Sequence, residues 1–305
     1  MSTNEILLAE ITRLKKERNA LILAHNYQVE EVQDIADFVG DSFFLSQKAA
    51  AATEEVIVFC GVHFMAESAA ILAPDKTVLL PAADAGCPLA DFADAEQVRQ
   101  WRARHPQAAV VAYINSSAEV KAEADICCTS ANAIKVVESL PHDEIIFLPD
   151  GNLGHYVASH FPEKTFHLWP GYCITHHRIT PEDVQAVRER HPQAEILVHP
   201  ECQPSVVALA DFVGSTSQIL DRVAKSPAKT LIIGTEMGVI HGLKKNHPDK
   251  EIYLLSSGLV CPNMKRTTLQ KIHHALENLE MRVTVAEPVR AKAYAALQRM
   301  LAVGR

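Results

Sequence analysis

Short runs of apolar and β-branched residues alternate along the chain with amphipathic stretches. Near the start, Leu21–Ala24, Val56–Phe59 and Thr77–Leu80 are bounded by polar, Gly or Pro residues, which is typical of buried parallel strands. The patterns of Glu30–Phe38 and Leu45–Thr53 predict helices between them. Strands that alternate with helices over short connections predict an α/β fold with parallel sheets covered by helices.

Three sets of segments recur at constant spacing, which indicates that the chain is a triplication. The aspartates at 37, 125 and 211 are separated by 88 residues (37 to 125) and then by 86 (125 to 211). The segments that share these offsets are Val32–Ser42, Val120–Ser130 and Val206–Thr216, the Pro-acid-Lys segments at 74–76, 162–164 and 248–250, and the runs Leu21–Tyr27, Ala109–Asn115 and Ile196–Glu201. Chance similarity would not keep the same offsets in independent segments. We therefore predict three repeated units, at residues 1–104, 105–190 and 191–305.

The end of the chain begins like a fourth copy and then departs from it. Arg282–Val285 has the pattern of a strand, and Pro288 to Leu301 has that of a helix. We expect this tail to complete the sheet or the helix layer of a neighbouring unit. At the other end, Ser2 and Glu5 have the spacing of a capping box that opens the first helix.

Composition narrows the classes of function. Among 305 residues, 29 Lys and Arg stand against 37 Asp and Glu, giving a net charge of −8, which disfavours binding to nucleic acid or an anionic membrane. No apolar run approaches the roughly 20 residues that span a bilayer, and the charged start of the chain does not resemble a signal peptide. We therefore expect a cytoplasmic protein whose seven cysteines are thiols or metal ligands. The chain has neither a dinucleotide-binding fingerprint nor a P-loop.

Three of the seven cysteines occupy the same place in the three units. Cys87, Cys173 and Cys261 follow the lysine of the Pro-acid-Lys segment by 11 (76 to 87), 9 (164 to 173) and 11 (250 to 261) residues. Ligands of open α/β sheets gather beyond the carboxyl ends of the strands, so a threefold arrangement would bring one thiol per unit to a common axis. Clustered thiolates bind soft metal centres. Three thiolates suit a [4Fe–4S] cube, because its fourth iron would keep a position open for a substrate oxygen.

Two other interpretations of these cysteines remain open. The three sulfurs, with His176 or water, would also bind zinc, although structural zinc sites commonly use CxxC pairs and this chain has none. Buried cysteines also act as small apolar residues. That interpretation suits a single cysteine better than three equivalent ones. It is our interpretation of the four that lack the repeat pattern, Cys60, Cys127, Cys128 and Cys202.

Polar residues follow the first strand of every unit. The pairs are His25 and Tyr27, Tyr113 and Asn115, and His199 and Glu201. Residues i and i+2 of an extended chain lie on the same side, so each unit directs two polar groups towards the axis. A lone histidine of this kind is more often a satisfied core residue, but equivalent placement in three units favours a function.

A hydroxyl residue also recurs before a helical stretch in each unit, at Ser42, Ser130 and Thr216. Helix N-capping alone would explain these hydroxyls. Three helix N-termini around one axis would also bind carboxylates or a phosphate. Lys265 and Arg266, which follow Cys261, either add positive charge to this site or are solvated.

Together these residues resemble a known family. The segments AHNYQ, GDS, AGCPLA, YIN, CCTSAN, GYCITHH, HPEC, GSTS and CPNMK are similar to quinolinate synthase over residues 20 to 270. The resemblance implies three homologous αβα domains in a pseudo-threefold arrangement around a central active site. It also implies one [4Fe–4S] cluster per chain, held by Cys87, Cys173 and Cys261.

The activity implied by this resemblance belongs to de novo NAD biosynthesis. It is the condensation of iminosuccinate (iminoaspartate) with dihydroxyacetone phosphate to quinolinate, with loss of phosphate and water. L-aspartate oxidase or aspartate dehydrogenase would supply the iminosuccinate. Matching the family's motifs makes Tyr27, His199 and Glu201 the acid and base candidates. The implied substrate contacts are His25, Ser42, Tyr113, Ile114, Asn115, Ser130, His199, Pro200, Glu201 and Thr216.

Three rival functions differ in what they require. A non-catalytic iron–sulfur sensor or electron carrier needs a fourth ligand and has little use for six polar residues at strand ends. A three-domain small-molecule binding module leaves the cysteines unexplained. Another [4Fe–4S] hydro-lyase would be separated from quinolinate synthase by its product.

Overall fold

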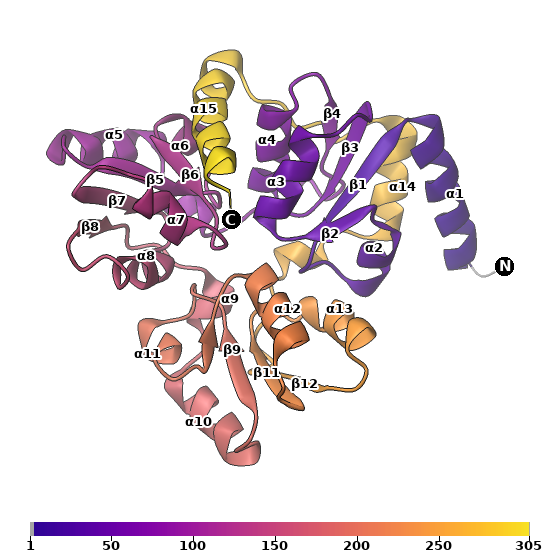
Figure 1. Ribbon diagram of the computed structural model, residues 1–305. Helices are drawn as coiled ribbons and strands as arrows, with labels where there is room; N and C mark the ends of the chain where they lie inside the picture. The colour runs from indigo at the N-terminus through magenta and orange to yellow at the C-terminus, as the bar shows by residue number, and fades with distance from the viewer. Residues whose placement is uncertain (1–2, 305) are drawn as a thin grey trace.

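The computed structural model describes residues 3–304, which form three lobes around a common centre (Figure 1). Each lobe is built on a four-stranded sheet whose strands are all parallel. The strand orders are β2-β1-β3-β4, β6-β5-β7-β8 and β10-β9-β11-β12, so corresponding strands hold corresponding places. Ser2, which we predicted to cap the first helix, lies outside the described residues.

The strands of the three sheets are short and mostly buried. The first sheet contains β1 (Ala20–His25), β2 (Phe38–Gly40), β3 (Val56–Cys60) and β4 (Thr77–Leu79). The second contains β5 (Ala109–Tyr113), β6 (Ile126–Cys128), β7 (Glu144–Leu148) and β8 (Thr165–Leu168). The third contains β9 (Glu195–Val198), β10 (Phe212–Val213), β11 (Thr230–Gly234) and β12 (Glu251–Leu254).

Helices flank every sheet. Those nearest the first sheet in sequence are α1 (Thr3–Glu17), α2 (Glu30–Ile35), α3 (Ser42–Ala50) and α4 (His63–Leu72). In the second lobe they are α5 (Ala95–Arg104), α6 (Ala118–Ala122), α7 (Ala133–Glu138) and α8 (Gly151–Ala158). In the third they are α10 (Pro181–Arg190), α11 (Pro204–Val207), α12 (Thr216–Lys225) and α13 (Val239–Asn246). The predicted α/β class, with three parallel sheets each flanked by helices, is confirmed.

Alternation along the central strands explains why helices cover both faces. In β1, Ile22 belongs to the apolar cluster beneath α1, whereas Leu21 and Leu23 pack with Phe43 of α3 on the opposite face. All of these side chains are almost fully buried. Burying a side chain of this size contributes about 1.5–3 kcal/mol. The two-faced apolar pattern therefore requires a three-layer αβα lobe.

The repeated aspartate adds a short strand that the pattern concealed. We predicted a helix over Glu30–Phe38, but α2 ends at Ile35 and β2 begins at Phe38. The reason is Asp37, whose carboxylate accepts the N–H of Ile22 at 2.8 Å and whose own N–H donates to the Ile22 carbonyl at 2.9 Å. Equivalent contacts join Asp125 to Val110 and Asp211 to Ile196. This repeat marker therefore aligns the edge strand with the central strand.

The tail joins two lobes. Val283 donates its N–H to the Val78 carbonyl at 2.9 Å, and Arg282 forms an antiparallel bridge with Leu79 of β4. Helix α15 (Glu287–Val303) then packs against α6 and β6 of the second lobe and against α4 of the first (Figure 1). Helix α14 (Leu269–Asn278) covers the first sheet beside α1. The segment Arg282–Val285, which has the pattern of a strand, thus forms only an isolated bridge, whereas the helix expected after it is α15.

The predicted boundaries at 104/105 and 190/191 fall just after α5 and α10. Both helices contact the lobe that follows them, because Arg102 pairs with Asp125 and Arg188 with Asp211, each at 3.1 Å. We propose three units, but these contacts group α5 with the second sheet and α10 with the third, whereas the predicted boundaries place each helix in the unit before. None of the helices in residues 3–304 combines the length and the apolar character needed to cross a bilayer.

Candidate active site

A single cavity of about 110 Å³ collects residues from the carboxyl ends of strands in all three sheets. The predicted site residues that line it are Cys87, Cys173, Cys261, His25, Tyr27, Tyr113, Asn115, His199, Glu201, Ser42, Ser130 and Thr216. Ile114 and Pro200 are buried beside these residues in the chain but do not line the cavity.

Each of the three cysteines lies on a loop that ends in a short helical turn. The turns are η1 (Ala90–Phe92), α9 (Ile174–His177) and η2 (Asn263–Lys265). Each loop is tied to the end of the third strand of its lobe by one backbone hydrogen bond of 2.8 Å. These bonds join the N–H of His63, Gly151 and Met237 to the carbonyl two residues before the cysteine, at Ala85, Gly171 and Leu259. The structure thus presents the three thiols in the same way.

The surroundings of the three thiols favour the protonated form when no cation is bound. Burial raises the pKa of Cys87 to about 12 and raises the pKa of Cys173 and Cys261 as well. The neighbouring thiol Cys261 adds to the rise at Cys87, and Cys87 adds to that at Cys173. Backbone hydrogen bonds to the third residue after each cysteine, Ala90, His176 and Met264, oppose it. A bound metal would deprotonate all three.

The other four cysteines lie in apolar cores, as we interpreted them from the sequence. Cys60, Cys127, Cys128 and Cys202 are fully buried and none lines the cavity.

His25 and His199 share one geometry. The Nδ1 atom of each accepts the N–H of the residue two positions on, Tyr27 or Glu201, at 3.2 Å. This contact assigns the proton of a neutral ring to Nε2, which in His199 donates to Ser130 Oγ at 3.2 Å. Burial lowers the pKa of His25 to about 4 and that of His199 to about 3, so both rings are neutral Nε2–H donors near pH 7.

The neutral state of His25 predicts acid sensitivity. Its pKa is about 4 when folded and 6.5 in its ordinary state, so the unfolded chain binds a proton more readily between those values. The unfolding free energy should therefore fall as the pH drops from 6.5 to 4, by about 3 kcal/mol from this residue. Denaturant unfolding of the metal-free protein at pH 7 and pH 4 measures the difference. His25→Asn should reduce it, and the same substitution at the exposed His142 is the control. An equal difference in wild type and His25→Asn would contradict the prediction.

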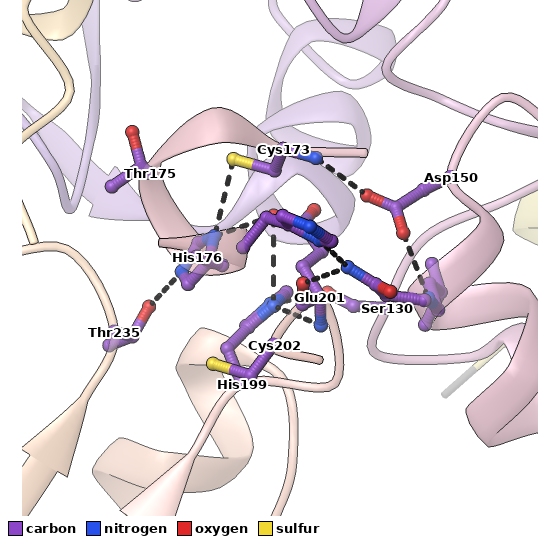
Figure 2. A network of polar contacts seen from close by, with 12 residues as sticks. Ser130, Asp150, Cys173, Thr175, His176, His199, Glu201, Cys202 and Thr235 are labelled. Carbon is purple, nitrogen blue, oxygen red and sulfur yellow. Dashed lines mark hydrogen bonds and ion pairs between the residues drawn. The ribbon is translucent and has the colours of Figure 1, made fainter. Parts of the chain in front are cut away.

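A chain of hydrogen bonds joins Glu201 to Tyr27 across the three lobes, and Figure 2 shows its part from Glu201 through His176 to Thr235. Glu201 lies 2.7 Å from His176 Nδ1, and His176 Nε2 lies 3.0 Å from Thr235 Oγ1. The Thr235 hydroxyl is 2.7 Å from the Tyr27 hydroxyl, which is also 2.7 Å from Thr216 Oγ1. The chain can move a proton between a carboxylate and a phenol without bulk water.

Glu201 is the charged centre of this network. Burial favours its neutral form, but the hydrogen bonds that it accepts from His176 Nδ1 and from the Tyr113 hydroxyl, at 2.5 Å, hold the pKa of Glu201 below its ordinary range. Burial, together with the charge of Glu201, raises the pKa of Tyr27 and Tyr113 well above the ordinary value. The site therefore pairs a carboxylate with two neutral phenols.

Sequence patterns missed part of this network. The sequence indicated His176 only as a possible zinc ligand, and no sequence pattern indicated Thr235. Neither has a chemical equivalent in the other units: the counterparts of His176 are Ala90 and Met264. Cys173, His176 and Glu201 do lie close enough together to bind a metal, but both ring nitrogens of His176 already have partners.

Helix capping, one of the two explanations of Ser42, Ser130 and Thr216, does not hold, because other residues occupy the N-cap positions. The N-caps of α3 and α12 are the preceding residues, Asp41 and Ser215. Ser42 and Thr216 are the first residues of those helices, and α7 begins three residues after Ser130. Because other residues cap the helices, all three hydroxyls are left to line the cavity.

One polar atom in the cavity lacks a partner. Among the described residues, Asn115 Oδ1 is buried without a hydrogen bond. Such an atom costs about 1–3 kcal/mol unless a ligand donates to it.

Comparison with known proteins agrees with this geometry. The model of the family described as "Quinolinate synthetase A protein" matches residues 9–302. The chain belongs to the quinolinate synthase family. A quinolinate synthase of Caldicellulosiruptor bescii is 56% identical over 300 residues, covering 98% of this chain and 99% of the relative. One from Methanoregula boonei is 55% identical over 303 residues, covering 99% of this chain and 100% of the relative. Quinolinate synthases therefore match the chain over nearly its whole length.

Proposed function

We propose that this chain condenses iminosuccinate with dihydroxyacetone phosphate to form quinolinate, phosphate and water. The observation that carries the proposal is the meeting of three repeat-equivalent cysteines in one cavity with polar residues from all three lobes. Membership in the quinolinate synthase family supports the same activity.

We propose that Cys87, Cys173 and Cys261 hold one [4Fe–4S] cluster. The donor set fits, because three thiols line one cavity. Their pKa values are raised, so a bound cation would be required to stabilise the thiolate forms. When bound, a cluster with three protein ligands supplies a Lewis-acidic iron for a substrate oxygen.

The chain's own polar groups would bind and orient the two substrates. Both substrates are anionic, and the Nε2–H of His25 and the hydroxyls of Ser42 and Thr216 are hydrogen-bond donors in the cavity. Asn115 Oδ1 would accept from the imine nitrogen or a hydroxyl of the substrate. Holding two reactants in place removes much of the entropic barrier to forming the bond between them.

Proton transfer would fall to Glu201 and Tyr27. Near pH 7 Glu201 is a carboxylate, the state that accepts a proton, and Tyr27 is a neutral phenol, the state that donates one. The chain through His176 and Thr235 would restore both groups after turnover. Positioned groups of this kind accelerate a step by about 10²–10⁴-fold.

The test is an anaerobic assay of the full chain loaded with iron and sulfide. Iminosuccinate is generated in place by L-aspartate oxidase, dihydroxyacetone phosphate is added, and quinolinate is measured by chromatography. We expect quinolinate from loaded protein and none from metal-free protein. A loaded protein that yields no quinolinate, or that dehydrates another acid instead, would overturn the proposal.

A further inference from the structure

Two buried carboxylates hold the backbone of two of the cysteine loops. Asp150 Oδ2 accepts the N–H of Cys173 at 3.2 Å (Figure 2). Glu236 Oε1 accepts the N–H of Cys261 at 3.1 Å. Both carboxylate residues are fully buried. They occupy one place in the triplication, 86 residues apart (150 to 236), so the fold makes the same contact twice.

The second oxygen of each carboxylate is also in use. Asp150 Oδ1 accepts the N–H of Leu153 at 2.8 Å and so caps α8. Glu236 Oε2 accepts the N–H of Gly238 at 2.7 Å, and Lys265 pairs with this carboxylate at 2.9 Å. In each residue the two N–H donors bind different oxygens of the carboxylate, and an amide has only one oxygen.

Capping a helix does not require a buried carboxylate. Serine caps as well as aspartate, and burying a carboxylate is costly. Asp94 caps α5 at the surface and reaches no cysteine. The burial of Asp150 therefore points to its second contact, the one with Cys173.

The first lobe lacks this contact. The residue equivalent to Asp150 and Glu236 is Val62, 88 residues before Asp150 (62 to 150). Among the described residues, the loop of Cys87 keeps only the backbone bond from His63 to Ala85 as its equivalent tie. The three loops are thus anchored unequally.

We propose that Asp150 and Glu236 are positioning residues that direct the sulfurs of Cys173 and Cys261 into the cavity before iron arrives. This inference rests on the proposed cluster. Partners that orient metal ligands typically change metal affinity by about 10–100-fold when they are removed.

Asp150→Ser separates the two contacts of Asp150. Serine keeps the cap on α8 but has one acceptor on a shorter side chain, so the N–H of Cys173 loses its partner. Wild type, Asp150→Ser and the control Asp94→Ser are loaded anaerobically with iron and sulfide. We measure iron and sulfide per chain, the visible spectrum, and the rate of iron loss to a chelator.

The expected result is a loss of iron from Asp150→Ser that is about tenfold faster than from wild type or Asp94→Ser. The electron paramagnetic resonance signal of the reduced cluster should also change, while circular dichroism shows that the metal-free variant is folded. If serine prevents folding, Asp150→Asn keeps the shape and one acceptor and should give the same direction. Iron retention equal to wild type in the folded variant would overturn this inference alone. A wild type that takes up no iron would overturn the proposed function as well.

Discussion

Replacing any one of Cys87, Cys173 and Cys261 by serine is expected to abolish both cluster binding and quinolinate formation. Each lobe contributes one sulfur to the cavity, so no other thiol can take the place of a lost ligand. A serine hydroxyl stays protonated where a thiolate is needed, because its oxygen is a far weaker acid. Iron and sulfide analysis after anaerobic loading, with the quinolinate assay, measures both losses.

Cys60→Ser is the matched control. Cys60 is fully buried at the end of β3, in the apolar cluster beneath α1, and does not line the cavity. A hydroxyl buried there costs stability, about 1–3 kcal/mol, but should leave iron and sulfide per chain unchanged. Full activity in any of the three cavity variants would refute the proposed ligand set, as would loss of the cluster in a folded Cys60→Ser.

The triplication explains why so much of the site was predictable. Residues that repeat at the same offsets must occupy the same place in each lobe, and the lobes meet at the carboxyl ends of their strands. His25, Tyr113 and His199 therefore came together from spacing alone. Repetition alone does not separate functional from structural residues. The aspartates at 37, 125 and 211 recur because they pair the edge strand with the central strand.

What breaks the symmetry could not be predicted. His176 and Thr235 act across lobes, and their neighbours are set by how the lobes face one another, which no pattern within one unit records. The capping residues could not be identified for a local reason. Asp41 and Ser215 lie one residue before Ser42 and Thr216, and aspartate and serine are both good N-cap residues. The sequence alone therefore does not show which residue of each pair is the cap.

Glu201→Gln is expected to lower kcat by about 10²–10⁴-fold while the iron content stays that of wild type. The substitution keeps the shape of the side chain but removes the charge. The present carboxylate accepts hydrogen bonds from Tyr113 at 2.5 Å and from His176 Nδ1 at 2.7 Å. A neutral amide offers one oxygen to these two donors and cannot take a proton from the substrate.

Glu144→Gln is the control for this experiment. Glu144 pairs with His167 at 3.0 Å at the start of β7, the end of the strand opposite to the cavity. It should leave both kcat and iron content near those of wild type. Unchanged turnover in Glu201→Gln would remove this residue from proton transfer and leave Tyr27 and His199 as the remaining acid–base candidates. Loss of iron together with turnover would instead mean that Glu201 supports the cysteines, since His176 lies between them, 3.3 Å from Cys173 Sγ. Measuring turnover and iron content in one preparation therefore decides whether Glu201 acts in proton transfer or in holding the cysteines.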